Sequence, residues 1–109
     1  MREQEIQKEI LHWLNTQYDI FAWRCNSTGI FDGKGYRKQG GFNIRGVSDI
    51  LAILSPSGKL LAIEVKTDTG KLSTEQFAFI AKINKMGGQA AVCRSLSDAQ
   101  VFIDNVRRG

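Results

Sequence analysis

The sequence predicts an α/β fold in which a mixed central sheet of about four strands is flanked by helices. Three observations lead to this prediction. Helical and strand-like segments follow one another in the order α-β-β-β-α-β-α, the longest apolar stretches have the length of strands, and no internal repeat is visible. The 109 residues are close to the commonest domain size, and 42% hydrophobic with 24% charged residues is ordinary for a globular chain. We therefore expect one domain over residues 1–109.

Each element is predicted from apolar periodicity and turn residues. Residues 3–17 carry apolar side chains at helical spacing, and residues 19–25 form an aromatic, strand-like stretch. Two apolar segments, 49–54 and 59–67, are joined by a Ser-Pro-Ser-Gly turn and predict a β-hairpin. A helix over 73–86 ends at a Gly-Gly pair, and a strand over 89–94 follows. The closing helix, 97–106, is expected to face inward with Val101, Phe102 and Val106.

The hairpin places two acids opposite one another. If Ser55 and Gly58 bracket a type I turn, residues paired across the hairpin have numbers that sum to 55 + 58 = 113, and Asp49 and Glu64 also sum to 113. Like charges that face each other across a sheet destabilise it, so this pair requires a cation. Lys66 lies on the same strand face as Glu64. Two carboxylates and an ammonium together suggest a site for a hard metal ion and phosphodiester hydrolysis.

Residues 26–46 predict a long glycine-rich loop that binds nucleic acid. The stretch holds six of the eleven glycines and, against one acid, four basic residues: Lys34, Arg37, Lys38 and Arg45. Basic and aromatic side chains on a flexible backbone suit phosphate contact and base stacking, and the net charge of +4 favours a polyanionic partner. The alternative is a mobile surface loop without a ligand.

The remaining composition limits the other classes of function. Cys25 and Cys93 are far apart in the sequence, and with the single His12 they match no familiar zinc spacing, so buried reduced thiols are expected. The chain has no stretch long enough to cross a membrane, and its first residues lack the apolar core of a signal peptide. We expect a cytoplasmic protein of a bacterial or phage-infected cell, with neither a membrane nor a small-molecule cofactor among its partners.

The combination of these motifs resembles the VRR-Nuc domain, a branch of the PD-(D/E)xK nuclease superfamily. The resemblance rests on an acid in the first helix, Gly-Val-Ser-Asp at 46–49, Ile-Glu-Val-Lys at 63–66, and a helix that opens Ser-Thr-Glu-Gln at 73–76. It covers residues 5–94, and the small stand-alone phage and bacterial members are the most similar in length. The proline of the superfamily name is absent here, which is usual within this branch. The implied fold is a restriction-endonuclease-like α-β-β-β-α-β core.

The resemblance also implies roles for individual residues. Asp49 and Glu64, with the Val65 carbonyl as a third donor, would bind Mg²⁺ or Mn²⁺, and Lys66 would hold the attacking water or stabilise charge on the phosphate. Glu5 matches the first-helix acid of the family, with Glu9 as its rival.

Two residues near the second helix keep alternative roles. Gln76 either caps the helix at Ser73 or lies beside the active site, and the two roles are compatible only if the helix start adjoins the hairpin. Lys71, in the preceding loop, would contact a phosphate or remain solvated.

The expected function is therefore metal-dependent, structure-specific DNA endonuclease activity. Branched DNA such as a Holliday junction is the favoured substrate, and a homodimer would supply two sites for its two symmetric strands. The first alternative is a restriction-like or general DNA nuclease with the same residues. The second is a non-catalytic DNA-binding module, which two facing acids near phosphate would not favour.

Overall fold

A computed structural model of the protein describes residues 1–25, 30–31, 36–37 and 44–109. Its elements are, in chain order, α1 (Glu3–Thr16), β1 (Ile20–Arg24), β2 (Ile30–Phe31), β3 (Tyr36–Arg37), β4 (Ile50–Leu54), β5 (Lys59–Val65), α2 (Thr74–Lys85), β6 (Gln89–Cys93) and α3 (Leu96–Arg108). The predicted order of the main elements is confirmed. The short strands β2 and β3 fall inside the predicted loop. They were not predicted, because two-residue strands leave no periodic pattern in a sequence.

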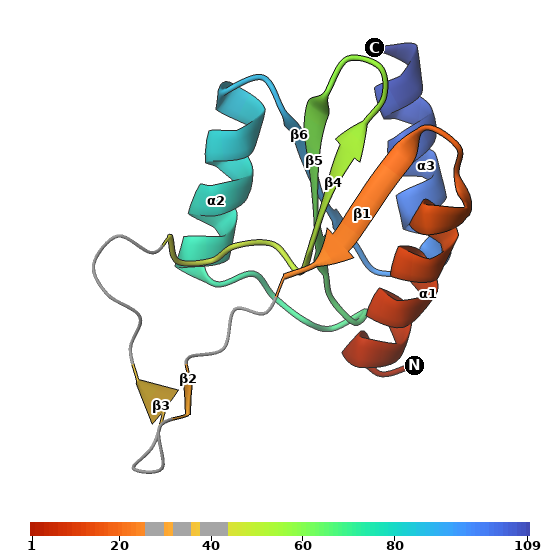
Figure 1. Ribbon diagram of the computed structural model, residues 1–109. Helices are drawn as coiled ribbons and strands as arrows, with labels where there is room; N and C mark the ends of the chain where they lie inside the picture. Colours follow the sequence, from red (N-terminus) through yellow and green to blue (C-terminus); the bar gives the residue numbers. More distant parts are fainter. Residues whose placement is uncertain (26–29, 32–35, 38–43) are drawn as a thin grey trace.

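The main sheet is mixed, with the strand order β1-β4-β5-β6. The β1–β4 and β4–β5 pairs are antiparallel, whereas β5 and β6 are parallel and are connected through α2. The strands β2 and β3 pair only with each other. The predicted four-stranded mixed sheet is therefore confirmed. Figure 1 shows α2 on one side of this sheet and α1 and α3 on the other.

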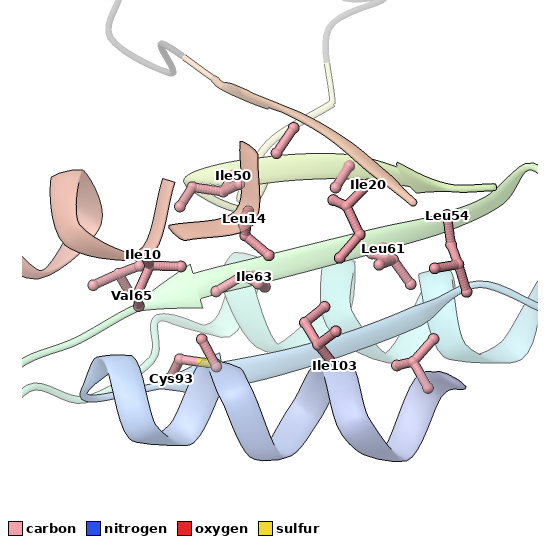
Figure 2. Close-up of a cluster of buried hydrophobic side chains, with 14 of the residues drawn as sticks. Ile10, Leu14, Ile20, Ile50, Leu54, Leu61, Ile63, Val65, Cys93 and Ile103 are labelled. Carbon is pink, nitrogen blue, oxygen red and sulfur yellow. The ribbon is translucent and has the colours of Figure 1, made fainter. Parts of the chain in front are cut away.

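The hydrophobic core lies between the sheet and the pair α1 and α3. Alternate residues of the strands face this side, because side chains of a strand alternate between the two faces of a sheet. Figure 2 shows the cluster, in which Ile10 and Leu14 of α1 and Ile103 of α3 are 0% exposed. We call this side of the sheet the inner face and the α2 side the outer face.

One predicted core residue is wrong. Val101 is 59% exposed, while Val106 is buried and Phe102 packs partly against the core. The buried positions of α3 are Ala99, Ile103 and Val106, spaced by four and three residues, and Val101 lies between two of them on the opposite side of the helix.

Two composition-based expectations can be compared with the structure. Cys25 and Cys93 are both free; Cys93 is buried, as expected, and Cys25 is half-buried. Within the described ranges, no helix has the length and apolar character needed to cross a bilayer.

Candidate active site

The hairpin of β4 and β5 has the predicted register. The paired residues from Ile50 with Ile63 to Leu54 with Lys59 all have numbers that sum to 113, so the next position places Asp49 opposite Glu64. The turn itself is wider than the predicted type I turn, because the Gly58 N–H donates to the Leu54 carbonyl at 2.8 Å. The register survives this difference because the turn opens by one residue on each strand: the last pair is Leu54 with Lys59 instead of Ser55 with Gly58, and both pairs sum to 113.

Asp49 is held by both of its neighbouring strands. Its backbone carbonyl accepts a hydrogen bond from Cys25 N–H at 2.8 Å, which extends the pairing with β1 by one residue. Its side-chain Oδ2 accepts from Val65 N–H, also at 2.8 Å. At the end of the hairpin, the Asp49 carboxylate therefore accepts the Val65 N–H in place of a backbone carbonyl. This contact fixes the Asp49 side chain beside the end of β5.

Glu64 is a buried carboxyl group with one oxygen unused. The residue is 1% exposed, and Oε1 accepts a hydrogen bond from Gln76 Nε2 at 3.1 Å. Its Oε2 is buried and has no hydrogen-bond partner. Burial, followed by the charge of Asp49, raises the pKa of Glu64 to about 8, although the nearby charge of Lys66 acts in the opposite direction. The charge of Asp49 therefore disfavours ionisation of the facing Glu64 carboxyl, as expected from the predicted register.

Gln76 takes both of the positions that the sequence left open. Its Oε1 accepts from Ser73 N–H at 2.9 Å, and Ser73 Oγ accepts from Gln76 N–H at 3.1 Å, which completes a capping box at the start of α2. The same side chain donates through Nε2 to Glu64. The cap thus orients the amide so that its donor end faces the acid. The two alternatives are compatible because the first turn of α2 adjoins the hairpin.

Gly46 allows the loop before β4 to lie close to the first turn of α2. Its φ is +75°, and a Cβ at this position would lie 2.3 Å from the carbonyl carbon of Glu75 and 2.6 Å from Gln76 N. Only glycine permits both this backbone conformation and such a close approach. The first residue of the Gly-Val-Ser-Asp motif therefore packs the loop before Asp49 directly against the first turn of α2.

The first-helix acids are placed differently from one another. The exposed Glu5 accepts a hydrogen bond from Arg2 N–H at 3.3 Å, and Glu9 is also exposed. Glu3 is half-buried, and its charge contributes to the raised pKa of Glu64 after burial and Asp49.

Glu3 was not among the predicted site residues, yet the helical pattern contained the signal for its position. Glu3 lies seven and eleven residues before the buried Ile10 and Leu14, and so falls on their face of the helix. Glu5 lies five residues before Ile10, away from that face.

The predicted nucleic-acid residues are only partly described. Arg45 and Lys71 are exposed, on the loops that lead into β4 and α2. Arg37 belongs to β3, but its side chain is outside the described part of the structure. Lys34 and Lys38 lie outside the described residues altogether.

The carboxylate pair fits a small hard cation. Across the described segments, no three His, Cys, Asp or Glu side chains gather into a metal-ligand cluster, so the side-chain donors here are Asp49 and Glu64. Mg²⁺ is commonly held by one or two carboxylates and keeps several waters, which matches this donor set. The buried, unpartnered Oε2 of Glu64 is a further sign of fit, because such an oxygen normally has a partner.

Comparisons with known proteins identify the family and the fold of the chain. The model of the VRR-NUC domain family matches residues 1–97, and the chain therefore belongs to this family of nuclease-like domains. Among solved structures, a protein described as "VRR_NUC domain protein" is similar with a TM-score of 0.65 and 18% identity, over 100% of this chain and 91% of the other. No curated protein matches the sequence.

Proposed function

We propose that the protein is a metal-dependent DNA endonuclease that hydrolyses phosphodiester bonds, and that Asp49, Glu64 and Lys66 form its catalytic site. The observation that carries the proposal is the facing pair of acids. Glu64 is 1% exposed, its Oε2 has no partner, and the neighbouring Asp49 contributes to a raised pKa. A buried acid opposite another acid is costly to a hairpin unless a cation or a proton joins them. Membership of a nuclease-like family supports the same conclusion.

Asp49 and Glu64 are the residues that would hold Mg²⁺ or Mn²⁺, with the Val65 carbonyl as a third oxygen donor. When bound, such an ion acidifies a water molecule and offsets negative charge on the phosphate. The protein contributes the placement of the donors: Val65 N–H positions Asp49 Oδ2, and Gln76 Nε2 positions Glu64 Oε1. Each acid thus keeps a second oxygen for the ion.

Lys66 would stabilise charge on the phosphate or hold the attacking water. Lys66 lies two residues after Glu64, a spacing that places both side chains on the same face of an extended chain. Its charge acts on the Glu64 carboxyl. The first-helix acid would act on a water near the pair. Glu5 keeps this role as a prediction, and the half-buried position of Glu3 makes it the stronger candidate of the two. Gln76 would act chiefly by orienting Glu64.

DNA is the proposed substrate, with branched DNA such as a Holliday junction favoured. The net charge of +4 and the exposed Arg45 and Lys71 near the site support phosphate contact. Lys34, Arg37 and Lys38 would add contacts from the glycine-rich segment.

A homodimer would present two sites to a symmetric junction. Support for an interface comes from the outer face of the sheet, where Phe21 is 66% exposed and its β4 partner Ile53 is 39% exposed. The change Phe21→Glu should therefore convert a dimer to a monomer in light scattering. Val101→Glu, which alters an equally exposed apolar residue on α3, should not. A wild-type monomer with and without junction DNA would remove the dimer from the proposal.

Cleavage assays test the enzymatic proposal. Four-way junction, flap, duplex and single-stranded DNA are incubated with Mg²⁺, Mn²⁺ or EDTA. We expect metal-dependent cutting that is lost in Asp49→Ala and Glu64→Ala while DNA binding is retained. Cutting that persists in both variants would refute the mechanism. Equal cutting of linear duplex would favour the general nuclease, and metal-independent binding without any cutting would favour the binding module.

A further inference from the structure

The segment after Lys66 is a tight turn attached to the end of the sheet. Lys66 N–H donates to the Cys93 carbonyl at 3.1 Å, which continues the pairing of β5 with β6. Gly70 N–H then donates to the Thr67 carbonyl, also at 3.1 Å, and closes the turn. We call residues 67–70 the post-lysine turn. It separates the candidate catalytic lysine from the loop that leads to α2.

Arg94 holds this turn from the neighbouring strand. It follows β6 directly, and its Nη1 donates to the Thr67 carbonyl at 2.6 Å and to the Gly70 carbonyl at 2.8 Å. Its own backbone N–H donates to Asp98 Oδ2 at 2.8 Å, which anchors the start of the side chain to α3. Hydrogen bonds from a guanidinium are stronger than those between neutral groups, and the planar group loses little freedom in forming them.

The post-lysine turn in turn limits the side chain of Lys66. A Cβ built on Gly70 would lie 3.3 Å from Lys66 Cδ and 3.5 Å from Lys66 Cβ, so Gly70 adjoins the aliphatic stem of the lysine and leaves less room than a methyl group needs. A lysine stem has four rotatable carbons and is otherwise free to place its ammonium in many positions. The contact with Gly70 removes part of that freedom on one side.

We propose that Arg94 is a positioning residue for Lys66. It fixes the two carbonyls of the post-lysine turn, the turn sets the position of Gly70, and Gly70 confines the lysine stem so that the ammonium stays near Glu64. Among the described residues, the side-chain hydrogen bonds of Arg94 go to Thr67 and Gly70 and to neither acid of the site. The inference rests on the proposed function, since it assigns Lys66 a catalytic task. Misplacement of a catalytic group by about 1 Å can cost on the order of 100-fold in rate, so a residue with this role matters to activity.

Three variants test the proposal. Arg94→Met keeps an unbranched apolar stem and removes the guanidinium with both of its hydrogen bonds. Gly70→Ala leaves Arg94 intact and crowds the lysine stem, because the added Cβ would lie only 3.3 Å from Lys66 Cδ. Arg108→Met is the matched control, because the Arg108 side chain is 75% exposed and pairs only with Asp104 on α3.

The first measurement does not depend on catalysis. NMR relaxation of the Lys66 side-chain Cε group reports its mobility in the metal-free protein. We expect greater mobility of Lys66 in Arg94→Met, a changed Lys66 signal in Gly70→Ala, and no change in Arg108→Met. The exposed Lys85 on α2 serves as an internal reference. Unchanged Lys66 mobility in folded Arg94→Met would overturn the proposal; should that variant not fold, an unchanged Lys66 signal in Gly70→Ala would do so.

The second measurement is cleavage kinetics. We expect kcat to fall by about 10-fold or more in Arg94→Met while KM for DNA stays within about twofold, with Arg94→Lys recovering part of the loss. A purely structural role would instead lower the fraction of active enzyme and would leave Lys66 mobility unchanged. If Lys66 becomes mobile and kcat does not change, the positioning role is refuted. If the wild type cuts no DNA, the proposed function fails, and the NMR result still decides whether Arg94 restrains Lys66.

Discussion

The two faces of the central sheet share the same strands but serve different purposes. On the inner face, Ile63 and Val65 of β5 pack in the core with α1 and α3, which together bury seven residues. On the outer face, the intervening Glu64 carries the candidate site, and α2 covers it without burying any residue of its own. Strand alternation thus lets adjacent residues stabilise the fold and carry charge. The comparison suggests that stability comes mainly from the inner face and chemistry from the outer one.

The strongest way to break this comparison is to remove one large apolar side chain from each helix layer. Ile103→Ala on α3 should lower the free energy of unfolding by about 2–5 kcal/mol, because it leaves a cavity in a fully buried position. Phe77→Ala on α2 should change it by less than about 0.5 kcal/mol, because Phe77 is 66% exposed. Urea denaturation of both variants measures the difference. Equal losses would show that α2 contributes as much to stability as α3.

The pH dependence of stability examines the outer face. An ordinary glutamate has a pKa near 4.5, and that of Glu64 in the folded chain is about 8. Between these pH values the folded state retains a proton that the unfolded chain has released, so stability falls as pH rises from about 4.5 to 8.

Glu64→Gln should remove this loss. In EDTA, its unfolding temperature should exceed that of the wild type at pH 8–9, by about 4 °C or more for each kcal/mol recovered, and the difference should shrink at pH 5. Glu75→Gln, which alters an exposed acid on α2, is the control. A constant difference across pH would argue against a proton held at Glu64.

A smaller effect should come from the contact that joins the two halves of the site. Gly46→Ala forces the α2 start away from the hairpin and should cost about 1–3 kcal/mol, with a larger proportional loss of cleavage because the Gln76–Glu64 hydrogen bond is disturbed. Gly58→Ala is the matched control, since Gly58 has a similar φ of +77° and open space around it. Equal effects would mean that backbone conformation alone explains the result.

The smallest expected effect concerns an ion pair at the edge of the inner face. Arg107 donates to both carboxylate oxygens of Asp19, at 2.7 and 2.9 Å, and this hydrogen bonding keeps the pKa of Asp19 below its usual 3.8. Asp19→Asn should cost about 1 kcal/mol at pH 7, since the arginine side chain is 32% exposed. The loss should begin to shrink below pH 3.8 and should disappear as pH falls through the lower folded-state pKa of Asp19, because the folded carboxylate then takes up a proton. Asp104→Asn, in an exposed pair with Arg108, should change little.

Local rules explain why most of the site could be predicted. The number of residues between two strands sets which side chains face each other, so the Asp49–Glu64 pair followed from counting, even though the turn proved wider than expected. The same periodicity placed Lys66 beside Glu64. Val101 was misassigned because α3 extends beyond both predicted ends, and its buried face, set by Ala99 and Ile103, lies elsewhere.

By itself, the sequence determined the order of the elements, the register of the hairpin and the acidic pair, because these depend on periodicity and turn length. Only the tertiary structure decided how distant segments meet at that pair. The approach of α2 to Gly46 let Gln76 cap a helix and bind Glu64 at once. The packing of α1 left Glu3 half-buried, where its charge acts on Glu64, and the parallel pairing of β5 with β6 brought Arg94 to the turn after Lys66. Such contacts depend on packing across the sheet, which no local pattern of residues encodes.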